Sequence, residues 1–112
     1  MNEKIYLKSL FAKSNRTSEE SLELFALLNL GILESLNHGL MSASEALYIF
    51  FHAENSLFVR QQMCDQIADE IMSRGVQLPD LFEVLPIEEA QRELTKLQTL
   101  CLNLLDQKLV AA

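Results

Sequence analysis

Apolar residues recur at steps of three and four along most of the chain, the spacing that places them on one side of an α-helix. In the last third of the sequence these positions are Ile87, Ala90, Leu94, Leu97, Cys101 and Leu104. No β-hairpin signal is present, and the chain has only three glycines. The pattern predicts an all-α fold whose helices pack side by side.

Two capping boxes mark helix starts in the first half of the chain. In Thr17-Ser-Glu-Glu20 the threonine hydroxyl can accept from the backbone N–H of the glutamate, whose carboxylate reaches back. Ser42-Ala-Ser-Glu45 has the same form. A helix is therefore expected from Thr17 to just before Gly39, a residue suited to the left-handed position after a helix. A second helix is expected from Ser42 to near Asn55.

Weaker signals divide the second half. Asn55 or Ser56 can cap a third helix, and Gly75 is interpreted as its stop. The last helix is expected to begin near Pro86, because proline suits the first helical turn. Between these two helices, a segment with two prolines predicts a one-turn helix near residues 80–84.

The helices are predicted to form one domain spanning residues 1–112, since a chain of this length has room for a single core. The architecture expected is a bundle of four main helices. Residues 1–16 precede it as a basic N-terminal arm or short helix, and Glu3 to Ala12 suits either form. Five side chains are expected deep in the core: Leu28, Phe50, Ile67, Leu97 and Leu104.

Two segments contain more apolar residues than is usual for a surface helix or for a connection between helices. The helix after Thr17 carries apolar side chains in nearly every direction, so it is expected at the centre of the bundle or as half of a dimer interface. The segment between Gly75 and Pro86 is apolar where connections are normally polar. It either covers the open end of the bundle or forms a ridge that docks on another protein. The candidate interaction surface comprises Leu24, Leu27, Leu30, Leu78, Leu81, Phe82 and Leu85.

Charge is distributed unevenly along the chain. Residues 1–16 contain four basic residues and one acidic residue, a net charge of +3. Residues 17–112 contain five basic and fifteen acidic residues, a net charge of −10. An acidic body repels phosphate backbones, so no nucleic-acid binding is expected. The composition is 49% hydrophobic, more than a small monomer buries easily, so a homodimer or a complex with another protein is expected.

The sequence favours a cytoplasmic protein without membrane attachment. Cys64 and Cys101 lie within apolar helical patterns and lack the spacing of a disulfide framework. No apolar signal-peptide region is recognisable near residue 1. The most apolar run, residues 22–36, is interrupted by polar residues and is shorter than the roughly 20 residues that span a membrane.

The segment His52-Ala-Glu54 matches the first half of the zinc-deaminase signature, in which a histidine ligand precedes a proton-transferring glutamate. That chemistry also needs a Pro-Cys-x-x-Cys segment for the remaining ligands. Cys64 and Cys101 have no such neighbours, and the strands of the deaminase fold are missing from the pattern. His52 is therefore expected near a helix C-terminus, where imidazole complements the helix dipole, with Glu54 in the following turn.

A different metal site would combine His38 and His52 with Cys64, Glu34 or Asp65. His38 directly precedes Gly39 in a helix-capping position, and the two histidines belong to different helix ends. No Gly-x-Ser-x-Gly element and no glycine-rich phosphate loop is present. No catalytic, cofactor-binding or metal-binding residues are therefore expected.

The leading hypothesis is a non-catalytic protein-interaction or regulatory module that self-associates. The alternative is an acidic inhibitor or immunity-type protein, steered by its negative charge to a basic enzyme or toxin. A small metal-dependent enzyme or sensor using His38 and His52 is the alternative from another class.

Overall fold

A computed structural model describes residues 3–12 and 17–111, with side chains described as far as residue 106. The helices are α1 (Leu7–Ala12), α2 (Ser18–Asn37), α3 (Ala43–Ile49), α4 (Ala53–Phe58), the π-helical turn η1 (Val59–Met63), α5 (Gln66–Val84) and α6 (Ile87–Ala111). No strand occurs within the described ranges. The predicted all-α fold is confirmed.

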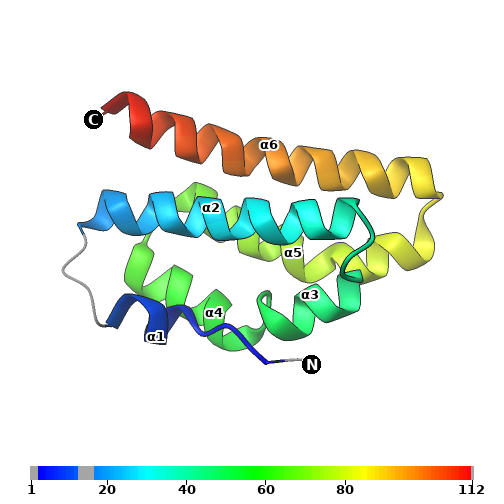
Figure 1. The fold of residues 1–112 in the computed structure, drawn as a ribbon, viewed down its shortest axis with the longest axis horizontal. Helices are drawn as coiled ribbons and strands as arrows, with labels where there is room; N and C mark the ends of the chain where they lie inside the picture. Colours follow the sequence, from blue (N-terminus) through cyan, green and yellow to red (C-terminus); the bar gives the residue numbers. More distant parts are fainter. Residues whose placement is uncertain (1–2, 13–16, 112) are drawn as a thin grey trace.

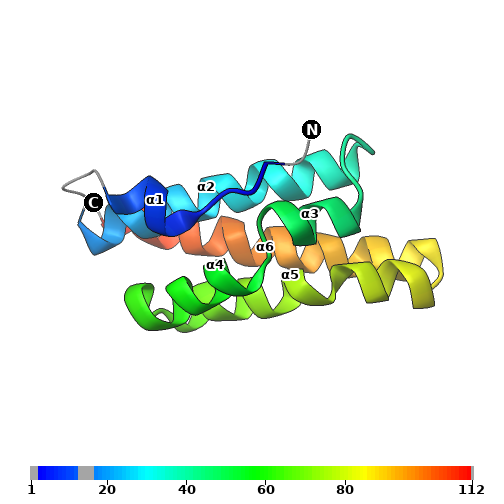
Figure 2. The same ribbon diagram turned by 90° about the horizontal axis from the view of Figure 1, so that it is seen from below.

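The three long helices α2, α5 and α6 form the body of the bundle, with α6 antiparallel to α2 (Figure 1). The short helices α1, α3 and α4 lie below α2, away from α6, in Figure 1. Seen from below in Figure 2, α1 overlaps α2 and α4 overlaps α5. Short helices therefore take the place of the fourth main helix. The N-terminal segment combines the two predicted forms, because residues 3–6 are non-helical and α1 follows. Residues 1, 2 and 13–16 of the predicted basic arm lie outside the described residues.

Both predicted capping boxes are confirmed. The N–H of Glu20 donates to Thr17 Oγ1 at 3.1 Å, and the N–H of Thr17 donates to Glu20 Oε1 at 2.9 Å. Ser42 and Glu45 exchange the same two bonds at 2.9 and 3.0 Å. The donating backbone N–H of Ser42, followed by its hydroxyl, holds the pKa of the Glu45 carboxyl below its ordinary value. Local sequence alone therefore sets these two helix starts.

The end of α2 also follows the prediction. Gly39 has φ +72°, the left-handed conformation that glycine adopts without steric cost. Its N–H donates to Leu36 O at 3.1 Å, and the N–H of Leu40 donates to Ser35 O at 2.9 Å. These two bonds make a Schellman motif, which satisfies carbonyls left open at the helix end.

The prediction for residues 55–85 is wrong in its boundaries. The chain breaks after η1 at Cys64, a left-handed residue with φ 51°, and Asp65 caps α5 by accepting from Ala68 N at 3.0 Å. Helix α5 then continues through Gly75 and Pro79 to Val84, so neither a stop at Gly75 nor a separate turn at residues 80–84 exists. A Cβ on Gly75 would overlap the ring of Phe51. The glycine therefore permits close packing against that ring rather than a helix end.

The core is formed by the inner sides of the long helices and by three phenylalanines. Phe50 stands edge-on to Phe51, with ring centroids 5.2 Å apart, and its centroid lies 6.3 Å from that of Phe25. The predicted core residues Phe50, Leu97 and Leu104 are fully buried. Leu28 and Ile67 are only partly buried, because each lies at the edge of its helix's buried side. The neighbour of Leu28, Asn29, is buried instead and donates to Phe25 O at 2.8 Å.

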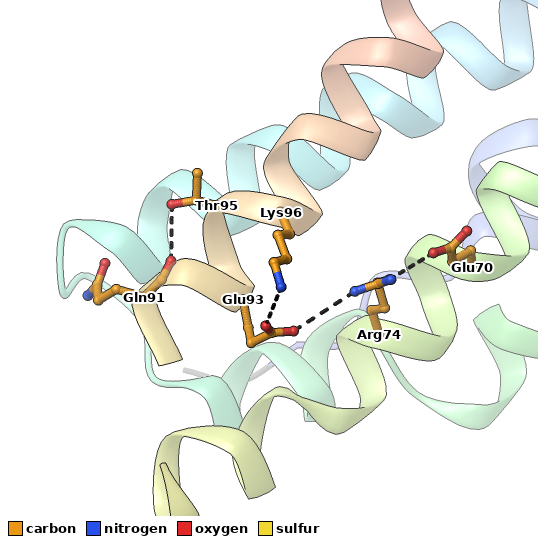
Figure 3. A network of polar contacts seen from close by, with 6 residues as sticks. All are labelled: Glu70, Arg74, Gln91, Glu93, Thr95 and Lys96. Carbon is orange, nitrogen blue, oxygen red and sulfur yellow. Dashed lines mark hydrogen bonds and ion pairs between the residues drawn. The ribbon is translucent and has the colours of Figure 1, made fainter. Parts of the chain in front are cut away.

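Helices α5 and α6 are joined at their surface by an ion-pair network (Figure 3). Arg74 of α5 lies 2.9 Å from Glu70 on its own helix and 3.9 Å from Glu93 of α6. Lys96 pairs with the same Glu93 at 3.0 Å. These four charged residues therefore find partners within the chain.

Candidate functional site

The outer face of α2 is the part of the predicted interaction surface that the fold leaves open. It consists of residues at helical steps opposite the buried side: Glu20, Glu23, Leu24, Leu27, Leu30, Gly31 and Glu34. Leu27 in the middle is 53% exposed, and Leu24 and Leu30 are partly exposed. Nothing lies within 4 Å of the place that a Cβ on Gly31 would occupy. The helix has an uncovered apolar side, so its predicted place at the centre of the bundle is wrong.

The second predicted contact segment does not form an exposed ridge. Because α5 extends to Val84, its apolar residues divide between the two sides of a helix. Leu78 is only 1% exposed and belongs to the core, which removes it from the candidate surface. The other three are partly buried: Leu81, Phe82 and Leu85. The apolar side chains that this end does expose, Val84 and Ile87, were not predicted.

The buried side chain of Asn55 makes three hydrogen bonds that the sequence analysis did not predict. Its Oδ1 accepts from the N–H of Leu7 at 2.9 Å, and its Nδ2 donates to Ile5 O and Phe50 O, both at 2.8 Å. The residue is 1% exposed. A buried amide whose bonds are satisfied in this way fixes the N-terminal segment to the bundle. Asn55 lies inside α4, not at the predicted helix start.

His52 supports the same attachment. Its Nε2 lies 2.9 Å from Ile5 O, and since a carbonyl only accepts, the ring nitrogen donates this bond. Tyr6 lies against the imidazole, with ring centroids 5.3 Å apart. The prediction of His52 at a helix C-terminus is wrong: α3 ends at Ile49, and His52 precedes α4 as its N-cap residue. Glu54 lies within α4 and not in a turn.

A groove of about 610 Å³ opens between α1 and the segment formed by α4 and η1. Phe11 and Phe58 line it with ring centroids 5.8 Å apart, and Lys8 and Glu54 also line it. The amide of Asn55 at this groove already makes three hydrogen bonds within the chain. The groove therefore presents a mixed apolar and charged surface, and its buried amide is already bonded within the chain.

The residues proposed as alternative metal ligands have other partners. His38 Nε2 lies 3.0 Å from Glu34 Oε1, one turn earlier on the exposed surface of α2. His52 Nε2 is hydrogen-bonded to Ile5 O, and Cys64 Sγ lies 3.4 Å from Gln61 O. Within the described residues no group of three or more His, Cys, Asp or Glu side chains could hold a metal ion.

The two cysteines differ in their surroundings. Cys64 is exposed, whereas Cys101 is buried inside α6. Burial raises the pKa of the Cys101 thiol to about 12, so this sulfur stays protonated and unreactive at neutral pH. The buried cysteine contributes to packing as a small apolar residue.

Comparison with known proteins yields one match. A family model described as "Protein of unknown function (DUF3969)" matches residues 16–110, which include all the helices from α2 to α5 and most of α6. No curated protein and no solved structure matches the chain. Among the described residues no helix is both long and apolar enough to cross a membrane.

Proposed function

The chain belongs to the DUF3969 family of proteins of unknown function, and we propose that it is a non-catalytic interaction module that self-associates through the outer face of α2. The observation that carries this proposal is the exposure of Leu27, at 53%, in the middle of a helix whose other side forms the core. An amphipathic helix of a monomer normally turns polar residues outward. Here Leu24, Leu27 and Leu30 share the outward side with glutamates.

The shape of this face supports contact with another protein. Gly31 is exposed and lies one turn after Leu27, so a shallow place without a side chain follows an exposed leucine. A side chain of the partner can pack over Gly31, and the partner's surface then covers Leu27. Central apolar side chains surrounded by polar ones are the usual composition of protein interfaces.

Sedimentation equilibrium of wild type and Leu27→Glu tests the proposal. We expect wild type to self-associate and Leu27→Glu to weaken association by roughly a hundredfold, because a charge in the middle of an interface loses its hydration. Leu40→Glu is the matched control: Leu40 is 81% exposed, lies between α2 and α3, and should change association little. Circular dichroism should show the same helix content in all three proteins. A wild type that stays monomeric at all concentrations would contradict self-association.

An acidic inhibitor of a basic protein is the second candidate function. It is favoured by the charge of α2, whose sequence contains four glutamates and neither lysine nor arginine. In that case Leu27→Glu would leave the chain monomeric, as wild type would be, and would still weaken binding to the basic target. The two candidates thus share a surface and differ in the occupant.

A further inference from the structure

The outer face of α2 carries three carboxylates, and one of them, Glu23, forms no ion pair with the described residues. Among the described residues, Glu19 and Glu23 have no ion-pair partner, and Glu34 pairs only with His38. By contrast, Arg60, Arg74 and Lys96 on the other helices are each within 4.0 Å of a carboxylate. These three cations therefore do not pair with α2, and Arg92 of α6 likewise forms no ion pair with the described residues.

The complementary charge is concentrated in the N-terminal segment. Residues 1–16 have a net charge of +3, in a chain whose remainder has −10. Lys4 and Lys8 are exposed and form no ion pair with the described residues. Lys4 lies 4.9 Å from the ring centroid of Tyr48, and Lys8 lines the groove beside α4. Leu10 on the same short helix is 43% exposed.

The basic segment and the acidic helix border the same side of the molecule. Figure 1 shows α1 below the N-terminal half of α2, and Figure 2 shows the two helices overlapping at nearly the same level. The bonds from Asn55 and His52 to Ile5 and Leu7 hold the basic segment in this position. Lys8 and Leu10 are therefore carried by a helix that lies near the N-terminal half of α2.

We propose that a second copy of this chain docks on this side, so that α1 of each copy packs on the outer face of α2 in the other. This inference rests on the proposed self-association and specifies its geometry. A two-fold axis between α1 and α2 makes the contact closed and self-complementary. Direct α2-to-α2 packing would place glutamates opposite glutamates, whereas the reciprocal arrangement places Lys4 and Lys8 near the carboxylates of α2. Leu10 and Leu27 supply the apolar contact.

Charge reversal tests the arrangement. Lys8→Glu and Glu23→Lys should each raise the dimer dissociation constant roughly tenfold at low salt, because each is repeated twice across a two-fold interface. Lys8→Glu combined with Glu23→Lys should return the constant to within about threefold of wild type, since opposite charges face each other again. Association of wild type should weaken as salt is raised.

Matched controls separate these contacts from a change in net charge. Arg92→Glu changes the net charge by the same amount as Lys8→Glu, and Glu83→Lys by the same amount as Glu23→Lys. Arg92 is exposed on α6, and Glu83 is exposed on α5. Neither control should change the dissociation constant more than about twofold. A control as disruptive as Lys8→Glu would overturn the proposed pairing.

Zero-length carbodiimide crosslinking gives an independent readout of the geometry. In an equal mixture of unlabelled and nitrogen-15-labelled protein, crosslinks between chains carry mixed isotopes. We expect mixed crosslinks that join Lys8 to glutamates of α2. Mixed crosslinks that join Lys96 of α6 to glutamates of α2, with none from Lys8, would overturn the inference.

The outcomes distinguish the two proposals. In one outcome, Leu27→Glu disrupts a dimer, whereas charge reversal at Lys8 and Glu23 has no effect and salt strengthens association. Self-association through α2 is then supported, and the α1-to-α2 arrangement is wrong. If wild type is monomeric at every concentration and yields no mixed crosslink, both are wrong. Loss of association in both charge variants with recovery in the double variant supports both.

Discussion

The α5–α6 side and the outer face of α2 carry similar residues, but they differ in whether other parts of the chain pack against them. On the α5–α6 side, Arg74 joins Glu70 to Glu93 (Figure 3). The next residue of α5, Gly75, lets the ring of Phe51 pack directly against the helix. On the outer face of α2, Glu23 has no ion-pair partner among the described residues and Gly31 has open space around it. Each region has glycine, glutamate and leucine on a helix, but within the described part of the chain only the first is covered by a neighbouring element.

This difference shows that an apolar pattern indicates which side chains of a helix could be buried, but not which of them are buried. The pattern is at least as apolar in α2 as in α6, yet Leu97 is fully buried and Leu27 is 53% exposed. Which leucines are covered depends on where the short helices α1, α3 and α4 lie. The uncovered ones are the strongest physical argument for a partner.

The largest expected contrast concerns leucine truncation. Leu97→Ala should lower the free energy of unfolding by about 2–5 kcal/mol, because it leaves a cavity in the core. Leu27→Ala should lower it by less than about 0.5 kcal/mol in dilute solution, where no second copy covers the side chain. Urea denaturation of both variants measures the two values.

Repeating the Leu27→Ala measurement at high protein concentration sharpens the contrast. If a second copy covers Leu27, the loss should grow with concentration, because binding stabilises the folded state. A loss for Leu27→Ala as large as that for Leu97→Ala in dilute solution would show that the outer face of α2 is buried within the monomer, against the structure described here.

The two helical glycines give the next largest contrast. Gly75→Ala should destabilise the protein by about 1–3 kcal/mol, since its Cβ would overlap the fully buried ring of Phe51. Gly31→Ala should stabilise it by about 0.5–1 kcal/mol, because alanine favours the helix and has open space. Thermal melts should move the two transition temperatures in opposite directions. Equal shifts would remove the distinction between the two sites.

The smallest contrast is electrostatic. Arg74→Gln should cost about 0.5–1 kcal/mol at low salt and less at high salt, because its ion pairs lie at the surface. Glu23→Gln should leave stability unchanged, since Glu23 has no ion pair to lose among the described residues. Urea denaturation at two salt concentrations checks both. A larger loss for Glu23→Gln would reveal an ion pair that supports the monomer.

The helix starts at Thr17 and Ser42 and the end at Gly39 could be predicted because each depends on residues within one turn. The reading of Gly75 as a stop failed for the opposite reason. Glycine serves both to end helices and to admit close neighbours, and only the position of Phe51, distant in sequence, decides between these uses. Pro79 then appears inside α5, where the sequence had suggested an irregular segment.

The accessibility expected of the candidate surface is found for only some of its residues. Leu24, Leu27 and Leu30 are accessible, whereas Leu78 is buried, because the continuation of α5 turns that side chain inward. The attachment of the N-terminal segment by Asn55 and His52 was missed. These residues act on Ile5 and Leu7, 47 to 50 positions away along the chain, and no local pattern marks such bonds.

The sequence by itself determined the all-α class, the caps and the charge division between residues 1–16 and the rest, because these depend on composition or on contacts within a helical turn. Only the tertiary structure decided that α5 runs unbroken past Gly75, that α1 is held against α4, and that Leu27 remains exposed. Those features arise where distant segments meet. Packing and long-range hydrogen bonds select among the conformations that local preferences leave available.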